Sequence, residues 1–259
     1  MRVELRATPS DELGSYVTEG TRGSHGEQIG FGRQMREAHF NFAPSYTPLN
    51  HGSFGAFPSR VRDRLGQLRD ETEARPDTLI RFAYPGLLRQ AREAVAPLLG
   101  AATDEVVLLP NATTAINIVL RNLCRDEGDT VIYFSTIYPS CLKTIQSIEE
   151  ETVATVTSHC IDLVYPIEDN EIVARFRTAV ESLLPRQPKG GIGKASKVVA
   201  VFDTVLTFPG VRFPWEALVR VCKEFGVISC VDGAHGVGHI DLSHLAREGP
   251  DFFVSNCYK

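Results

Sequence analysis

The sequence predicts an α/β fold in which a mostly parallel sheet carries helices on both faces. From Val106 onward, short apolar segments of strand length alternate with longer segments whose apolar residues recur at helical spacing. Several of the short segments are apolar at nearly every position, which is typical of strands that are covered on both sides. Regular alternation of strands and helices favours crossover units, and such units build parallel sheets.

Length and composition allow one sizeable core. The chain has 259 residues, of which 43% are hydrophobic and 23% are charged, a composition that argues against disorder. Its formal net charge of -5 supplies no basic surface of the kind that attracts nucleic acid or anionic membranes. We therefore expect a small-molecule substrate, with no nucleic acid partner and no membrane partner.

The six cysteines indicate a reducing compartment. They are scattered along the chain without a C-x-x-C pair, which argues against a disulfide scaffold and against a zinc ribbon. No apolar run approaches the ~20 residues of a membrane helix, and the N-terminus lacks the apolar core of a signal peptide. These features predict a cytoplasmic protein.

The N-terminal part of the chain predicts an extension followed by scaffold helices. Residues 1–30 are rich in Gly, Ser, Thr and charge without periodicity, and we expect them to form a mobile extension. Apolar residues at helical spacing predict helices over Pro58–Arg75 and Leu87–Leu98. Pro97 lies inside the second pattern and should kink that helix or end it early.

Periodicity also predicts the remaining elements. Short apolar segments predict strands at Val106–Leu109, Thr130–Phe134, Thr152–Cys160, Lys197–Phe202, the run that ends at Asp232, and Asp251–Val254. Segments with one apolar face predict helices after Asn111, through Lys143 and Ile148, over Ile172–Leu184, and over Trp215–Phe225.

Two of the predicted strands deliver functional groups to one edge of the sheet. A buried run ends in Asp232, and the strand Asp251–Val254 is followed by Lys259. Open α/β sheets bind ligands beyond the carboxyl ends of their strands. An acid and an amine that meet there indicate a pyridine cofactor bound as a Schiff base. A further strand ends at Asp203, which brings a second acid to the same edge.

Each of these residues also fits an ordinary structural role. Asp232 could cap a turn at a strand end, and Lys259 could be a solvated lysine. Thr113 and Thr114 begin a predicted helix, where free amides and the helix dipole favour a phosphate, but an ordinary Asn or Thr cap is the more common reason for such residues when they are taken alone.

Five stretches together resemble the class V aminotransferase-like enzymes, which use pyridoxal 5'-phosphate in the type I fold. In chain order they are Asn50-His-Gly-Ser-Phe-Gly55, Asn111-Ala-Thr-Thr-Ala-Ile-Asn117, Phe202-Asp-Thr-Val-Leu-Thr-Phe-Pro-Gly210, Asp232-Gly-Ala-His235 and Asp251-Phe-Phe-Val-Ser-Asn-Cys-Tyr-Lys259. The resemblance covers roughly Phe31 to Lys259. Within the family, the sequence is most similar to the branch of isopenicillin N epimerase, the fungal hercynylcysteine sulfoxide lyases of ergothioneine synthesis and the loline-pathway enzyme.

The resemblance implies roles for residues around the cofactor ring. Lys259 would form the Schiff base and then remove the Cα proton of the substrate, and Asp232 would keep the pyridine nitrogen protonated. His235 and Thr204 would lie near the 3'-oxygen of the cofactor. Tyr138 would occupy the position of the aromatic ring that stacks on the pyridine face.

The resemblance also implies contacts at the phosphate and at the rim of the site. Thr113 and Thr114 would bind the phosphate at their helix N-terminus. Asn256 and Tyr258 fall where the family often has Ser and His in contact with the phosphate, so the sequence departs from the pattern there. The expected rim of the substrate site consists of Asn50, His51 and Gly52.

We expect no metal centre. His235, His239 and His244 are close in sequence and could ligate a metal, but no cysteine or carboxylate spacing completes a tetrahedral set around them.

The resemblance implies that residues 31–259 form the large domain, which binds pyridoxal phosphate. Family members continue beyond the Schiff-base lysine with more strands and a small C-terminal domain, and the full-length proteins are homodimers. We therefore expect this chain to be truncated at Lys259, with the small domain missing.

The resemblance implies a reaction at the Cα or Cβ of an amino acid. We expect β-elimination by a C–S lyase from a cysteine-derived sulfoxide or thioether, in secondary metabolism of the fungal type. An epimerase, an aminotransferase, a cysteine desulfurase and a catalytically inactive truncated remnant stay open as alternatives.

Overall fold

The structure is a computed structural model that describes residues 29–153, 155–183 and 196–258. Most of the predicted N-terminal extension, residues 1–28, and the predicted Schiff-base residue Lys259 lie outside the described residues. The chain forms two compact units. One contains the described residues up to Leu49 and Ala56–Leu68, and the other contains Asn50–Gly55 and the chain from Arg69 onward.

The smaller unit holds helix α1 (Arg33–His39) and most of α2 (Ser59–Ala74), so the helix predicted for Pro58–Arg75 is confirmed. Neither helix contains a buried residue. Arg36 organises the segment that follows α1, because its guanidinium donates hydrogen bonds of 2.7 Å to the carbonyl oxygens of Ala43 and Tyr46.

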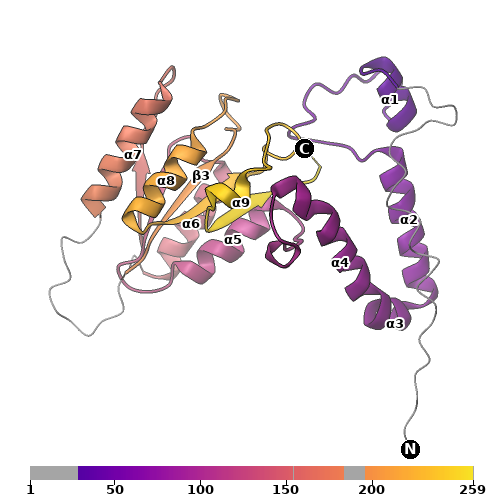
Figure 1. Cartoon of the computed structure of the whole chain (residues 1–259), viewed down its shortest axis with the longest axis horizontal. Helices are drawn as coiled ribbons and strands as arrows, with labels where there is room; N and C mark the ends of the chain where they lie inside the picture. The colour runs from indigo at the N-terminus through magenta and orange to yellow at the C-terminus, as the bar shows by residue number, and fades with distance from the viewer. Residues whose placement is uncertain (1–28, 154, 184–195, 259) are drawn as a thin grey trace, which may run out of the picture. The chain divides into compact units, whose positions relative to one another are not determined.

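The larger unit is built on a five-stranded parallel sheet of order β2-β1-β3-β4-β5 (Figure 1). The strands are β1 (Thr130–Phe134), β2 (Thr157–Ile161), β3 (Val198–Asp203), β4 (Ile228–Gly233) and β5 (Phe252–Ser255). All neighbouring pairs are parallel, which confirms the predicted sheet type. After β1 the chain adds β2 on one side, and then returns to add β3 on the other. The topological switch point therefore lies between β1 and β3, where ligands of open α/β sheets bind.

Helices cover both faces of the sheet (Figure 1). One face packs against α5 (Ala112–Leu123) and α6 (Pro139–Glu151), and the other packs against α7 (Asp169–Leu183) and α8 (Trp215–Phe225). Successive strand residues point to opposite faces. Val199 and Val201 accordingly join the α5–α6 core, whereas Phe202 joins the α7–α8 core together with Trp215. Both faces of β3 are therefore buried, which explains why its sequence is apolar at every position before Asp203.

A chain of short helices precedes the sheet. It consists of α3 (Pro76–Thr78), a π-helical turn (Leu79–Ala83), α4 (Tyr84–Val95), and 3₁₀ turns at Ala96–Leu99 and Thr103–Glu105. The prediction for Pro97 is confirmed, because α4 ends two residues before it and continues only as a 3₁₀ turn. Gly100 then closes the segment in a left-handed conformation at φ 57°. A further short helix, α9 (Leu245–Glu248), precedes β5 and was not predicted.

Two strand predictions were wrong in part. The segment Val106–Leu109 begins in an extended conformation, but none of the described residues forms a ladder with it, and Val107 is 73% exposed. The strand predicted for Thr152–Cys160 begins only at Thr157, because α6 continues to Glu151 and the Thr152 amide still bonds the carbonyl of Ile148 at 3.0 Å.

A buried carboxylate fixes the amino-terminal end of the sheet. Asp129 is fully buried and accepts hydrogen bonds from the amides of Lys197 (2.8 Å), Arg125 (3.1 Å) and Asp126 (3.0 Å). The Lys197 ammonium lies 2.9 Å from its second oxygen. Burial alone would raise the pKa of Asp129, but these hydrogen bonds outweigh it and lower the pKa from its ordinary value.

Across the three described ranges, every helix is too short or too polar to cross a lipid bilayer.

Candidate active site

A cavity of about 390 Å³ opens at the carboxyl edge of the sheet, beside the switch point. Its wall is formed by the ends of β3 and β4, the chain after β5, the first turn of α5, the residue before α6, and the Asn50–Gly55 loop. Of the predicted site residues, those that line it are Thr113, Thr114, Tyr138, Asp232, His235, Asn256 and Tyr258. The structure therefore brings together residues that lie up to 145 positions apart in the sequence.

Two carboxylates lie at the floor of the cavity. Asp203 and Asp232 are register partners on β3 and β4, and are 6% and 5% exposed. The Oδ1 atom of Asp232 accepts the amide of Ala234 at 2.9 Å, and its Oδ2 atom accepts the thiol of Cys141 at 3.6 Å. A floor with two buried acids favours a ligand that presents a positive charge or a protonated nitrogen to it.

The first turn of α5 forms part of the cavity wall. Asn111 is the N-cap, and its side chain accepts the amide of Thr114 at 2.8 Å. The side chain of Asn256 accepts the amide of Ala112 at 3.0 Å, so the chain after β5 is tied to this helix end. Thr113 lies between these two amides on the cavity wall. The positive end of the helix dipole makes this wall suitable for an anion.

Tyr138 contributes an aromatic ring on another side of the cavity. It is the residue before α6, with extended ψ of 131°, and it remains 37% exposed. Pro139 occupies the first helical position, where its fixed φ suits the start of a helix. An exposed ring at the wall of a cavity can stack on a flat ligand.

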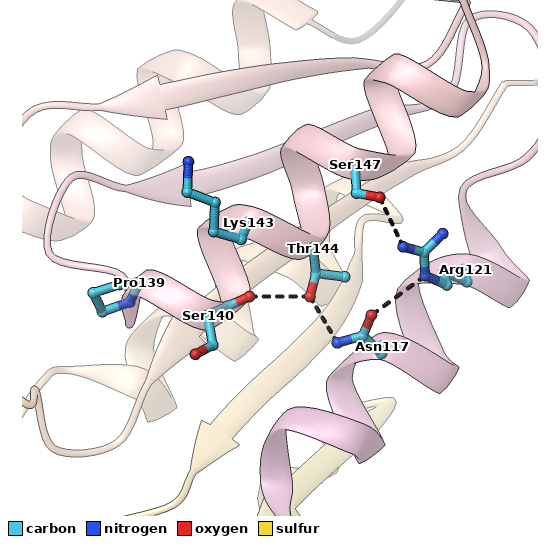
Figure 2. Close-up of a pocket in the computed structure, with 7 residues that line it drawn as sticks. All are labelled: Asn117, Arg121, Pro139, Ser140, Lys143, Thr144 and Ser147. Carbon is cyan, nitrogen blue, oxygen red and sulfur yellow. Dashed lines mark hydrogen bonds between the residues drawn. The ribbon is translucent and has the colours of Figure 1, made fainter.

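Hydrogen bonds tie together α5 and α6, the two helices whose first turns bound the cavity (Figure 2). The Asn117 amide group donates to the Thr113 carbonyl at 3.0 Å and to the Thr144 hydroxyl at 2.7 Å. The Thr144 hydroxyl donates in turn to the Ser140 carbonyl at 3.1 Å. Arg121 also belongs to this network, because its Nε–H donates to the side-chain oxygen of Asn117 at 3.3 Å. This network joins the first turn of α5 to the first turn of α6, and so holds two walls of the cavity in register.

The predicted rim differs from the observed wall. Asn50, His51 and Gly52 do not line the cavity, and Ser53 of the same loop does. Gly55 explains the position of the loop, since a Cβ atom built there would lie 1.9 Å from the Tyr258 carbonyl oxygen. The absence of a side chain therefore lets the loop pack directly on the backbone of the residue that precedes Lys259.

Thr204, predicted to lie near the 3'-oxygen of the cofactor, is not among the residues that line the cavity. It is fully buried, and its hydroxyl has no hydrogen-bond partner among the described residues. That hydroxyl faces Gly236, where an added Cβ would approach it to 3.1 Å. The physical reason is the alternation of side chains at a strand end: Asp203 lines the cavity, so its neighbour Thr204 points elsewhere. Asp203, which the sequence brought to this edge as a second acid without a specific role, lines the cavity beside Asp232.

His235, His239 and His244 are the histidines of this region. Within the part of the chain that the structure describes, no three His, Cys, Asp or Glu side chains are grouped as a metal would require.

Comparison with curated proteins finds relatives with related names. The L-cysteine desulfhydrase-like protein lolT1 of Epichloe uncinata is 35% identical over 238 residues, which cover 90% of this chain and 49% of that protein. The hercynylcysteine sulfoxide lyase of Schizosaccharomyces pombe is 28% identical over 88% of this chain and 54% of its own length. The isopenicillin N epimerase of Streptomyces clavuligerus is 26% identical over 83% and 50%. The chain spans about half the length of the curated relatives that it matches.

Solved structures show the same fold. A cystine C–S lyase, determined in complex with its reaction product cysteine persulfide, superposes with a TM-score of 0.69 at 18% identity, over 83% of this chain and 54% of that chain. The predicted α/β fold of type I pyridoxal-phosphate enzymes is thereby confirmed. The sequence profile of class V aminotransferases matches residues 83–259, which is more than half of the chain. The chain therefore belongs to the class V aminotransferase family.

Proposed function

We propose that this chain forms the cofactor-binding part of a pyridoxal-5'-phosphate-dependent C–S lyase that acts on a cysteine derivative. One observation carries the proposal: the buried carboxylate of Asp232 and the N-terminus of α5 line the same cavity. The named activities of the relatives, which include an L-cysteine desulfhydrase and a hercynylcysteine sulfoxide lyase, support a sulfur-containing amino acid as the substrate.

The residues of the cavity fit this cofactor. The volume of about 390 Å³ lies in the usual range for small-molecule sites, ~300–1,000 Å³. Asp232 would hold the pyridine nitrogen, Thr113 and Thr114 would hold the phosphate at the start of α5, and Tyr138 would cover the face of the ring. Acid, helix N-terminus and aromatic ring are the three kinds of group that a charged, flat, phosphorylated pyridine needs.

When bound, the cofactor supplies an electron sink for the negative charge that develops at the substrate Cα. Asp232 would retain a proton at the pyridine nitrogen by pairing its carboxylate with it. Lys259 would hold the cofactor through Nζ, and its amine would remove the Cα proton of the substrate. His235, on the cavity wall after β4, would donate a hydrogen bond to the 3'-oxygen of the ring. Water would be excluded on one side by Tyr138.

The proposed reaction differs from its alternatives after the Cα proton is removed. In β-elimination the Cβ–S bond breaks and sulfur leaves with its electron pair, whereas epimerisation returns the proton to the opposite face of Cα and transamination removes the amino group from the substrate. The three outcomes share the residues proposed above, so substrate contacts decide among them.

A product assay tests this proposal. The protein is incubated with hercynylcysteine sulfoxide, L-cysteine and S-alkylcysteines, and pyruvate and the sulfur product are quantified. Pyruvate formed in equal amount to the sulfur product supports a C–S lyase. Racemised substrate without pyruvate would identify an epimerase, a lasting pyridoxamine form would identify a transaminase, and persulfide with alanine would identify a desulfurase. Absence of every product, with cofactor bound, would leave the inactive remnant as the correct alternative.

We also propose that the protein acts as a homodimer in the cytosol. Exposed apolar side chains, including Val107 (73%), Leu109 (41%) and Ile118 (46%), support a covering partner surface. The six free cysteines support a reducing compartment. Light scattering at several protein concentrations and cell fractionation would test the two statements separately.

A further inference from the structure

A buried thiol lies beneath the carboxylate at the cavity floor. Cys141 belongs to the first turn of α6 and is 1% exposed, and its Sγ atom lies 3.6 Å from Oδ2 of Asp232. The other carboxylate oxygen, Oδ1, accepts the backbone amide of Ala234 at 2.9 Å. The two oxygens of Asp232 are therefore held by donors from two different elements, the turn after β4 and the start of α6.

We propose that Cys141 is a positioning residue for Asp232: its thiol orients the carboxylate toward the ring nitrogen of the bound cofactor and stabilises the ionised carboxylate. This inference rests on the proposed function. It extends that function by assigning to α6 a second role beside the presentation of Tyr138, the residue that precedes the helix.

The protonation state of the thiol suits this role. Burial raises the pKa of Cys141, and the charges of Asp232 and Asp203 raise it further. The sulfur therefore keeps its proton and can serve only as a donor to the carboxylate. A thiol is a weak donor, and its contact is longer than the 2.5–2.7 Å typical of a hydroxyl donating to a carboxylate. The carboxylate is thus oriented without losing much of its capacity to bind a proton on the cofactor.

Packing alone offers the competing explanation, because Cys141 also belongs to the core between the sheet and α5–α6. Cys222 provides a matched control. It is a fully buried cysteine on a helix, and it packs in the core on the opposite face of the sheet. Truncation of Cys222 should cost as much packing as truncation of Cys141, but without a change at the cavity.

The first experiment needs no cofactor. The infrared S–H stretching band of the protein should contain a component that disappears in Cys141→Ala and shifts in Asp232→Asn. Cys222→Ala should remove a different component, which Asp232→Asn leaves in place. A Cys141 band that is identical in the wild type and in Asp232→Asn would overturn the hydrogen bond itself.

The second experiment measures binding of pyridoxal 5'-phosphate and the pH titration of its visible absorbance. Cys141→Ala should weaken binding by about three- to tenfold, as expected for loss of one weak hydrogen bond, and should move the titration midpoint. Cys141→Ser should restore both properties in large part, and Cys222→Ala should leave both at the wild-type value. Equal binding and titration for the wild type and Cys141→Ala, or an equal loss in Cys222→Ala, would overturn the inference. Failure of the wild-type protein to bind the cofactor would instead overturn the proposed function, and the infrared result distinguishes the two cases.

Discussion

A single methyl group at Gly55 should disturb the active site from outside the cavity. In the substitution Gly55→Ala, the new Cβ would lie 1.9 Å from the Tyr258 carbonyl oxygen and 3.1 Å from Nε2 of His51. Real Cβ contacts are essentially never shorter than 3.0 Å, so the loop and the Tyr258 backbone must separate by at least about 1.1 Å. A backbone carbonyl cannot turn aside as a flexible side chain can, and Lys259 is the next residue in the chain.

The expected magnitude follows from this displacement. A misplacement of about 1 Å in a catalytic group can reduce the rate by about 100-fold. We therefore expect Gly55→Ala to lower kcat by roughly ten- to 100-fold. The cost in unfolding free energy should stay near 1–2 kcal/mol, since an exposed loop can move to relieve the clash.

The assay compares Gly55→Ala with Gly52→Ala. Gly52 lies in the same loop, and a Cβ at that position would meet no heavy atom within 4 Å. Both variants are tested for thermal unfolding, for the visible absorbance of bound cofactor and for lyase turnover. Gly52→Ala should resemble the wild type, and Gly55→Ala should lose turnover and change the absorbance. Wild-type turnover in Gly55→Ala would refute the claim that this loop positions the lysine segment.

Three further variants test other parts of the account. Asn256→Ala leaves the buried amide of Ala112 without its acceptor, so the unfolding free energy should fall by about 1–2 kcal/mol. Cofactor affinity should fall as well, and a loss of stability with unchanged affinity would show that the hydrogen bond has only a structural role. Asn117→Ala removes the hydrogen bonds that link α5 to α6. We expect weaker cofactor binding, with a loss of less than about 2 kcal/mol in unfolding free energy. Unchanged cofactor affinity would limit the network to a structural role. Asp129→Asn should cost about 2 kcal/mol or more at neutral pH. The folded-state pKa of Asp129 is lowered, so the stabilisation by its carboxylate is present above the ordinary value of 3.8 and is lost as pH falls through the folded value. Below about pH 4, the unfolding free energy measured in urea should therefore fall less steeply with pH in the variant than in the wild type. An equal pH dependence of the unfolding free energy in both proteins would contradict the assignment.

The local pattern of apolar residues was sufficient to predict most strands of the sheet. Thr130–Phe134 forms β1 with the predicted bounds, and the strand before Asp232 forms β4, because apolar runs covered on both faces leave little choice of conformation. Val106–Leu109 has a similar composition but no ladder partner among the described residues. A strand needs a neighbour, and a short apolar run does not specify one.

Site residues could be predicted where their position follows from the strand or helix that carries them. Asp232 at a strand end and Thr113 at a helix start both line the cavity as placed from sequence. Asp203 lines the cavity and Thr204 does not, and the sequence does not reveal which of two adjacent residues at a strand end faces the cavity. The contact of Asn256 with Ala112 joins positions 144 residues apart, and that of Cys141 with Asp232 joins positions 91 apart. Such contacts form only when the whole domain folds, and no spacing within one segment of the sequence predicts them.

Covalent trapping of the cofactor tests the central claim most directly. The protein is loaded with pyridoxal 5'-phosphate, reduced with borohydride, digested and mapped by mass spectrometry. The account predicts one labelled peptide, with the label on Lys259, and predicts that Lys259→Ala abolishes both the label and the visible absorbance while Asp232→Ala retains part of the absorbance with little turnover. A label on Lys143, Lys197 or any other lysine, with Lys259 unmodified, would contradict it.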